Sequence, residues 1–249
     1  MKENIENFLK NFFQKHFYGQ HPEAALRYAP IVKEIKKLKL GNSKILEIGS
    51  GSLGITPYLK RQIDAIDIDF SGPRTNLINK IKAKGVKLPF KKNSYDVTIS
   101  ADVLEHIEKE NREKAIFEML RITKKLAVIV VPCGDYSQKQ DKDLRDHWNK
   151  IFPNKNQFLE EHARNGLPQA EELLVIIDKC KRSLGKKAKV RSYANLNLSI
   201  RNVLMRTWIT KNKYMYYLYL KGYLLFVPIL KYFNFGKTYR RVFVIEFSK

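Results

Sequence analysis

The chain has 249 residues, of which 44% are hydrophobic and 12% aromatic, and it carries 47 Lys and Arg against 25 Asp and Glu. This composition excludes a disordered chain, and the length favours one sizeable α/β domain over two. The two cysteines, Cys133 and Cys180, lie too far apart in sequence to indicate a zinc knuckle or a disulfide framework. The N-terminal stretch contains acids and no uninterrupted apolar run, so we expect no signal peptide and a cytoplasmic location.

The net charge of +22 is concentrated near the C-terminus. Residues 181–249 contain 16 Lys and Arg and a single acid, Glu246. A basic region of this size attracts anions such as nucleic acid, anionic lipid headgroups or phosphorylated substrates. The alternative is that lysine is simply frequent on every surface of this protein.

The first half of the chain alternates between two kinds of pattern. A helical cap over 1–40 is followed by a core over 41–134, in which short apolar runs predict strands of a parallel sheet covered on both faces. The expected strands are 44–49, 62–67, 96–101 and 126–132, and the expected helices are 55–61, a region around 73–82, and 108–123. Such alternation is typical of a doubly wound sheet.

The second half adds two helical segments to this sheet. A polar helical insert covers 135–185, and a candidate strand follows at 187–196. A basic, aromatic helical insert covers 196–235, and the last strand is expected at 241–248. We interpret both segments as insertions within one domain spanning 1–249.

The stretch "KILEIGSGSLG" places glycines at 49, 51 and 54 after the first strand, which is the spacing of a dinucleotide site. Glu47 argues against a dinucleotide, because a carboxylate beside this turn would repel a pyrophosphate. S-adenosylmethionine (SAM) instead presents an ammonium and a sulfonium here, which an acid attracts. Asp67, in "AIDID", suits two ribose hydroxyls in either case.

Four motifs in order, from about residue 18 to 133, resemble the class I SAM-dependent methyltransferases of the broad type 11 kind. They are "ILEIGSGSLGI", "AIDID", "GVKLPFKKNSYDVTISADVLEHI" and "EMLRITKKLAVIVVPCG". The resemblance implies an α/β, Rossmann-like, doubly wound sheet of seven strands with a terminal antiparallel strand. The two helical inserts would then lie before and after strand six of this sheet. It also implies SAM as the cofactor.

The resemblance further implies which residues bind the cofactor. The methionine end would be held by Glu47, Gly49, Ser50 and Gly51, and the ribose by Asp67. The adenine would pack beside Ile68 and meet the backbone of Leu88, Ala101 would line the methyl-transfer face, and Arg27, next to Tyr28, would cover the cofactor's carboxylate.

Two departures from the family pattern stand out. The family's third glycine often stands at the position of Leu53, whereas this chain has its third glycine one residue later, at Gly54. Lys84 replaces an acid that commonly accepts a hydrogen bond from the adenine amine, and a lysine cannot accept it. A non-catalytic binding module on the same fold is therefore an alternative.

Methyl transfer to a hydroxyl or an acidic carbon needs a base, and Asp102 and His106 follow the fourth strand, where a base would lie. A purely structural role for His106 is the alternative. The "EEHARNGLP" stretch, which contains His162, is a candidate lid over the acceptor. The five histidines are scattered along the sequence, so we expect no metal site.

The aromatic insert is the best indication of the acceptor. Lys221 and Pro228 interrupt it, which excludes a membrane span but suits a helix at the membrane interface. Alternatively, it forms a wall of the acceptor pocket or binds a protein. We expect O- or C-methylation of a small molecule, a glycan or a lipid-linked precursor, with an anionic membrane surface as a candidate partner. An RNA methyltransferase is the less favoured alternative, because no appended RNA-binding module is visible.

Overall fold

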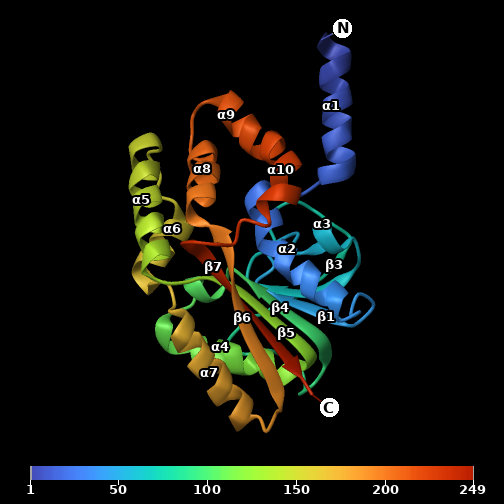
Figure 1. The fold of residues 1–249 in the computed structure, drawn as a ribbon. Coiled ribbons are helices and arrows are strands. Elements are labelled where there is room, and N and C mark those ends of the chain that lie inside the picture. The colour runs from blue at the N-terminus through green and yellow to red at the C-terminus, as the bar shows by residue number, and fades with distance from the viewer. Residues whose placement is uncertain (1, 249) are drawn as a thin grey trace.

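One seven-stranded sheet runs through the molecule in the computed structural model, which describes residues 2–248 (Figure 1). Its strands are β1 Ile45–Ile48, β2 Ile63–Asp67, β3 Ile78–Lys82, β4 Tyr95–Ala101, β5 Thr123–Pro132, β6 Ala188–Asn197 and β7 Thr238–Phe247. They are ordered β3-β2-β1-β4-β5-β7-β6. The first five strands are parallel, and β7 is antiparallel to both of its neighbours. The predicted α/β doubly wound sheet with a terminal antiparallel strand is confirmed.

Helices precede, connect and cover the strands. They are α1 Lys2–Phe17, α2 Pro22–Lys37, α3 Thr56–Leu59, η1 Leu104–His106, α4 Lys109–Ile122, α5 Asp135–Ile151, α6 Gln157–Asn165, α7 Ala170–Ser183, α8 Leu198–Trp208, α9 Lys213–Tyr217, η2 Leu218–Gly222 and α10 Tyr223–Leu230. The predicted helical insertions are present, with α5 to α7 before β6 and α8 to α10 between β6 and β7.

One predicted helix is absent, and another is shorter than expected. The region around 73–82 contains no helix, and its second half is the edge strand β3, which pairs with β2 from Ile63↔Ile78 onward. The free edge of β2 offers unpaired backbone groups, and this tertiary pairing outweighs a weak local helical preference. The helix expected over 55–61 is the single turn α3, which ends at Lys60 in a left-handed conformation with φ 53°.

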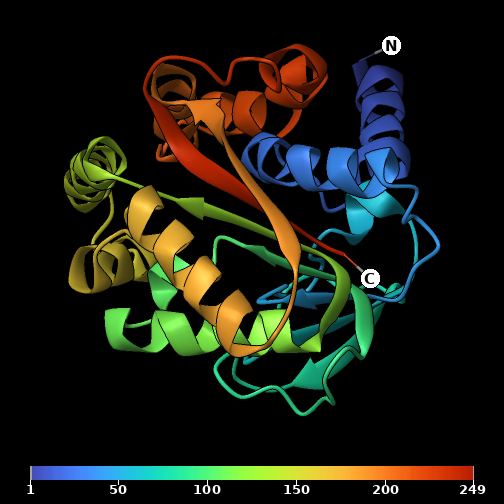
Figure 2. The same cartoon turned by 60° about the horizontal axis from the view of Figure 1, so that its bottom comes forward.

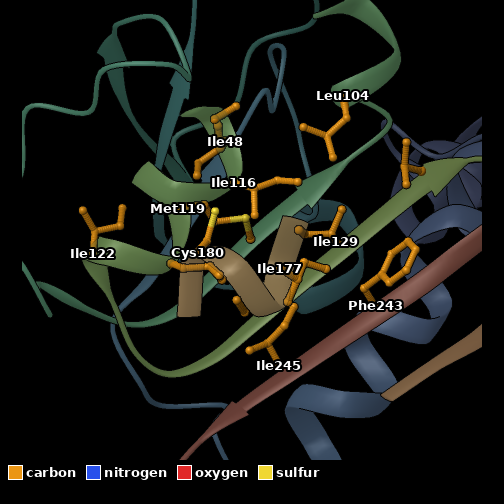
Figure 3. Packing of buried hydrophobic residues seen from close by; sticks show 14 of the residues in the cluster. Ile48, Leu104, Ile116, Met119, Ile122, Ile129, Ile177, Cys180, Phe243 and Ile245 are labelled. Carbon is orange, nitrogen blue, oxygen red and sulfur yellow. The ribbon is translucent and has the colours of Figure 1, made fainter. Parts of the chain in front are cut away.

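Both faces of the sheet are packed against helices, which explains the nearly continuous apolar run of β5. Val128 and Val130 belong to the core shared with α2, whereas Ile129 and Val131 belong to the core shared with α4 and α7. Figure 3 shows part of the second core, in which Ile177 of α7 lies among side chains of the sheet and of α4. Burying each large apolar side chain contributes about 1.5–3 kcal/mol to stability.

The helices after β6 gather beside α2 at one end of the sheet (Figure 2). Leu26 of α2 packs in one apolar cluster with Leu204 of α8, Tyr219 of η2 and neighbouring side chains of α10. The hydroxyl of Tyr219 also lies 3.2 Å from Nδ1 of His21, the residue that caps α2. The basic aromatic insert is therefore attached to the helix that covers the glycine turn. Among residues 2–248, no helix combines the length and apolar character that crossing a membrane requires.

Candidate active site

The glycine turn after β1 lies at the carboxyl ends of the parallel strands, where ligands bind in open α/β sheets. The amides of Gly49 and Ser50 donate to the carbonyl of Ile66 in β2, at 2.8 and 3.3 Å. Gly49 has φ +75°, and a Cβ there would come within 2.3 Å of the Val103 side chain. Glycine is thus required at position 49 both by backbone conformation and by close packing against the loop after β4.

The carboxylate of Glu47 is fully buried, and it connects α2 to the glycine turn. It accepts hydrogen bonds from the hydroxyl of Tyr28 at 2.8 Å and from the amide of Ile55 at 2.7 Å. Burial raises the pKa of Glu47 to about 7, despite the opposing effect of these bonds. A Cβ on Gly54 would lie 2.1 Å from Oε2 of Glu47, so the displaced third glycine makes room for this carboxylate. Sequence reasoning missed this structural role; the attraction of Glu47 for a positively charged ligand stays a prediction.

Asp67 at the end of β2 holds the other side of the turn. Its Oδ2 accepts from the amide of Gly51 at 2.6 Å, and its Oδ1 accepts from the amides of Ile68 and Asp69 at 2.7 and 3.1 Å. A Cβ added to Gly51 would meet no atom within 4 Å, so a ligand has open access to the backbone there. The Ile68 side chain is 64% exposed beside it. An open glycine backbone, an acid and an exposed apolar side chain together suit a nucleoside such as the adenosine of SAM.

Two of the remaining predicted cofactor contacts lie deeper than expected. Ala101 is buried at the end of β4, next to the loop that begins with Asp102. Leu88 is also buried, its amide donates to Glu118 at 2.9 Å, and its carbonyl accepts from Arg121 at 3.2 Å. A backbone contact between Leu88 and the adenine would have to replace or share these two hydrogen bonds, and it stays a prediction. Lys84 is exposed on the loop after β3.

The predicted residues Arg27 and Asp102 are brought together, in an ion cluster. Asp102 accepts from Nη1 of Arg27 at 3.1 Å and from Nε of Arg240 at 2.7 Å, and Arg240 also contacts Glu23. Asp102 has φ +55°, a conformation that is strained in a residue other than glycine and is frequent at functional sites. Because its oxygens already accept hydrogen bonds from two guanidiniums, Asp102 holds the α2 and β7 side chains in place and is a poor candidate for a base.

The other predicted catalytic residue, His106, lies in η1 beside the polar insert. Its Nδ1 lies 2.7 Å from Oε2 of Glu161 in α6, and its ring centroid is 4.9 Å from that of His162. Burial lowers the pKa of His106, and the neighbouring His162 lowers it further. Sequence reasoning did not single out Glu105, and it named His162 only as part of the candidate lid. The available signal was the dipeptide Glu–His, which occurs in both "LEH" and "EEH".

Comparisons with known proteins identify the kind of domain and support the fold. Residues 46–131 match the family model described as a methyltransferase domain. The magnesium protoporphyrin IX methyltransferase of Synechocystis PCC 6803, solved with bound S-adenosylhomocysteine, has a TM-score of 0.52 and 12% identity, over 91% of this chain and 84% of its own. The methyltransferase domain of a bacterial Hen1 has a TM-score of 0.51 and 13% identity, over 90% of this chain and 98% of its own. These two structures share the fold.

A Thermotoga maritima SAM-dependent methyltransferase has 15% identity over 99% of this chain and 98% of its own, with a TM-score of 0.49. A search of curated sequences finds no match.

Proposed function

Because the chain carries a class I methyltransferase domain that uses SAM, we propose that it methylates a hydroxyl of a lipid-linked acceptor at an anionic membrane surface. In such a transfer the acceptor oxygen bonds to the methyl carbon while the carbon–sulfur bond breaks. The electron pair of that bond returns to sulfur, and the hydroxyl proton passes to water. Since the sulfonium is already a good leaving group, the protein contributes chiefly by aligning the two reactants and excluding water.

The exposed aromatic surface of the basic insert carries this proposal. We call this surface the aromatic patch; it comprises the exposed side chains of Tyr214, Met215, Tyr217, Leu225, Phe226, Ile229 and Tyr232. Exposed large apolar side chains gathered in one segment favour a binding surface. Lys213, Lys221 and Lys231 lie within the same segment, and the chain contains no acid between Asp178 and Glu246. Aromatic side chains beside basic ones are typical of helices that lie at an anionic membrane interface.

The aromatic patch is joined to the candidate site through α2. Helix α10 packs on α2, whose capping residue His21 contacts Tyr219. On the same helix, Arg27 reaches Asp102 in the loop after β4. An acceptor whose lipid part rests against the patch would thus extend its polar part toward the end of β4, which His106 follows in η1.

Flotation with anionic liposomes tests the membrane contact. The chain should float at low salt and float less at high salt, because exposed charges are screened. Phe226→Glu should abolish flotation, since it places a charge in the aromatic patch. Val175→Glu is the matched control, because Val175 is also an exposed apolar residue but lies on α7. No flotation at low salt, or equal loss in both variants, would contradict the membrane contact.

Transfer of a labelled methyl group tests the acceptor class. Incubation with methyl-labelled SAM and cell extracts should place the label in the lipid fraction, and Phe226→Glu should reduce it while leaving SAM binding unchanged. Label in RNA would instead favour the RNA methyltransferase alternative, for which the acid-free basic surface would serve as the phosphate contact.

A further inference from the structure

Two Glu–His dipeptides far apart in sequence meet beside the candidate site. Glu105 and His106 end the short helix η1, whereas Glu161 and His162 lie in α6, which packs against η1. Glu105, His106 and His162 each present a ligand atom, and these three atoms lie within 4.8 Å of one another. Carboxylate and imidazole groups at such distances match the donor set of a transition-metal site.

The buried atoms of this group have no other partner among the described residues. Both carboxylate oxygens of Glu105 and Nε2 of His162 are buried without a hydrogen bond. Glu105 is only 1% exposed and His162 only 7%. Burying an unpaired carboxylate costs several kcal/mol, so such groups in proteins are normally paired, protonated or bound to a metal.

The opposite nitrogen of each histidine is held by a carboxylate. Nδ1 of His162 lies 2.7 Å from Oδ2 of Asp141, and Nδ1 of His106 lies 2.7 Å from Oε2 of Glu161. Because a carboxylate only accepts, each Nδ1 carries the hydrogen and each Nε2 keeps its lone pair. This carboxylate–histidine arrangement is the usual outer support of metal-binding imidazoles. Asp141 is fixed in turn by the hydroxyl of Tyr239 at 2.8 Å.

We propose that Glu105, His106 and His162 bind one divalent transition-metal cation of the Zn²⁺, Co²⁺ or Mn²⁺ class. Two imidazoles and one carboxylate favour these ions over Mg²⁺ and Ca²⁺, which prefer oxygen ligands. Three protein ligands leave further coordination positions open, as in catalytic metal sites.

The position of the site gives the cation a role that rests on the proposed function. η1 begins three residues after Ala101, at the end of β4 where the methyl group is expected. A hydroxyl bound to an open position of the cation would release its proton to water more readily, and the resulting oxyanion would attack the methyl carbon. His106 then acts as a ligand and not as the base.

Titration of the chelator-treated full chain with Co²⁺ and with Zn²⁺ tests the site without any acceptor. Calorimetry should give one ion per chain, and bound Co²⁺ should change the visible absorption spectrum. His106→Ala and Glu105→Gln should weaken binding at least about 100-fold, and Asp141→Asn should weaken it about 10–100-fold through the loss of outer support. His147→Ala is the control, because His147 lies on α5 outside the group.

The readouts separate this inference from the proposed function. His106 is partly exposed, so its removal should leave the fold intact, as circular dichroism would show, and SAM titration should be unchanged in that variant. Failure of the wild-type chain to bind either cation at micromolar concentration would overturn the metal site. Equal binding by His106→Ala and the wild-type chain would overturn it as well, whatever the acceptor proves to be.

Discussion

The hydroxyl of Tyr28 donates to the carboxylate of Glu47 at 2.8 Å, and this bond joins the N-terminal cap to the first strand of the sheet. Both side chains are buried. Glu47 also orders the turn through the amide of Ile55, so one carboxylate couples α2, β1 and the glycine turn. Its protonation state should therefore affect both the stability of the fold and the shape of the cofactor site.

Replacing Glu47 by Gln should remove a specific pH dependence of stability. Burial raises the pKa of Glu47 from 4.5 to about 7, so the folded state keeps its proton up to about pH 7, whereas the unfolded state loses it near pH 4.5. The wild-type free energy of unfolding should then fall by on the order of 3 kcal/mol as pH rises through this window. Glu47→Gln mimics the protonated form, because the hydroxyl of Tyr28 can rotate to accept from the amide.

The measurement is urea denaturation of both proteins between pH 5 and 8. His21, whose pKa burial lowers to about 4, works in the opposite direction but is common to both proteins, so the difference between them isolates Glu47. If the free energies of unfolding of the two proteins change with pH in parallel, Glu47 does not take up a proton on folding.

The glycines at 51 and 54 should respond differently to alanine. Both have positive φ, which costs an L-residue about 1–2 kcal/mol. Gly54→Ala additionally places a Cβ against Glu47, whereas a Cβ at Gly51 meets no atom. Gly54→Ala should therefore cost several kcal/mol of stability, and Gly51→Ala only about 1–2 kcal/mol.

Cofactor binding gives this comparison a second readout. Calorimetric titration of Gly51→Ala with SAM should show a loss of affinity of at least about tenfold, because the added methyl group occupies the space through which the ligand approaches the backbone. Wild-type affinity in Gly51→Ala would mean that the cofactor does not come near this turn residue.

Arg240 should be essential to the fold, in contrast to its neighbour. It is buried and contacts both Asp102 and Glu23, so Arg240→Met leaves buried carboxylates with fewer cationic partners, which typically costs 3–5 kcal/mol. Arg241→Met removes a hydrogen bond to Ser192 on the partly exposed opposite face and should cost less than about 1 kcal/mol. Equal midpoints of chemical denaturation for the two variants would refute this role of Arg240.

Local sequence patterns were sufficient to predict the glycine turn, because this part of the site is determined by backbone conformation and by where the strands end. The positions of Glu47, Gly49 and Asp67 followed from the end of a strand and from the glycine spacing, and the structure brings them together at one turn. The sheet itself followed from apolar runs that are buried on both faces, as in β5.

Contacts between segments that are distant in the chain could not be predicted from local sequence patterns. The meeting of His106 with His162 depends on how α6 packs against η1, and no local pattern encodes that packing. The edge strand β3 forms because β2 presents an unpaired edge, although its own sequence contains only Ile78 and Ile81 as apolar positions. The hydrogen bond from the amide of Leu88 to Glu118 of α4 likewise depends on packing between distant segments.

Asp67 should be the side chain on which cofactor affinity depends most. Each of its oxygens accepts from a backbone amide, with Gly51 on one side and Ile68 and Asp69 on the other. In Asp67→Asn, one oxygen becomes an NH₂ donor that faces an N–H donor, so the turn loses a hydrogen bond worth about 1–2 kcal/mol. SAM affinity, measured by calorimetry, should fall at least about tenfold, because both the turn and the predicted ribose contact are affected. Asp69→Asn is the matched control, because the exposed carboxylate of Asp69 accepts from Ser71 within its own loop. The SAM affinity of this variant should stay within about twofold of wild type. A similar loss in both variants would indicate a general effect of negative charge near the site, and an unchanged Asp67→Asn would show that the acid at the end of β2 does not bind the ribose.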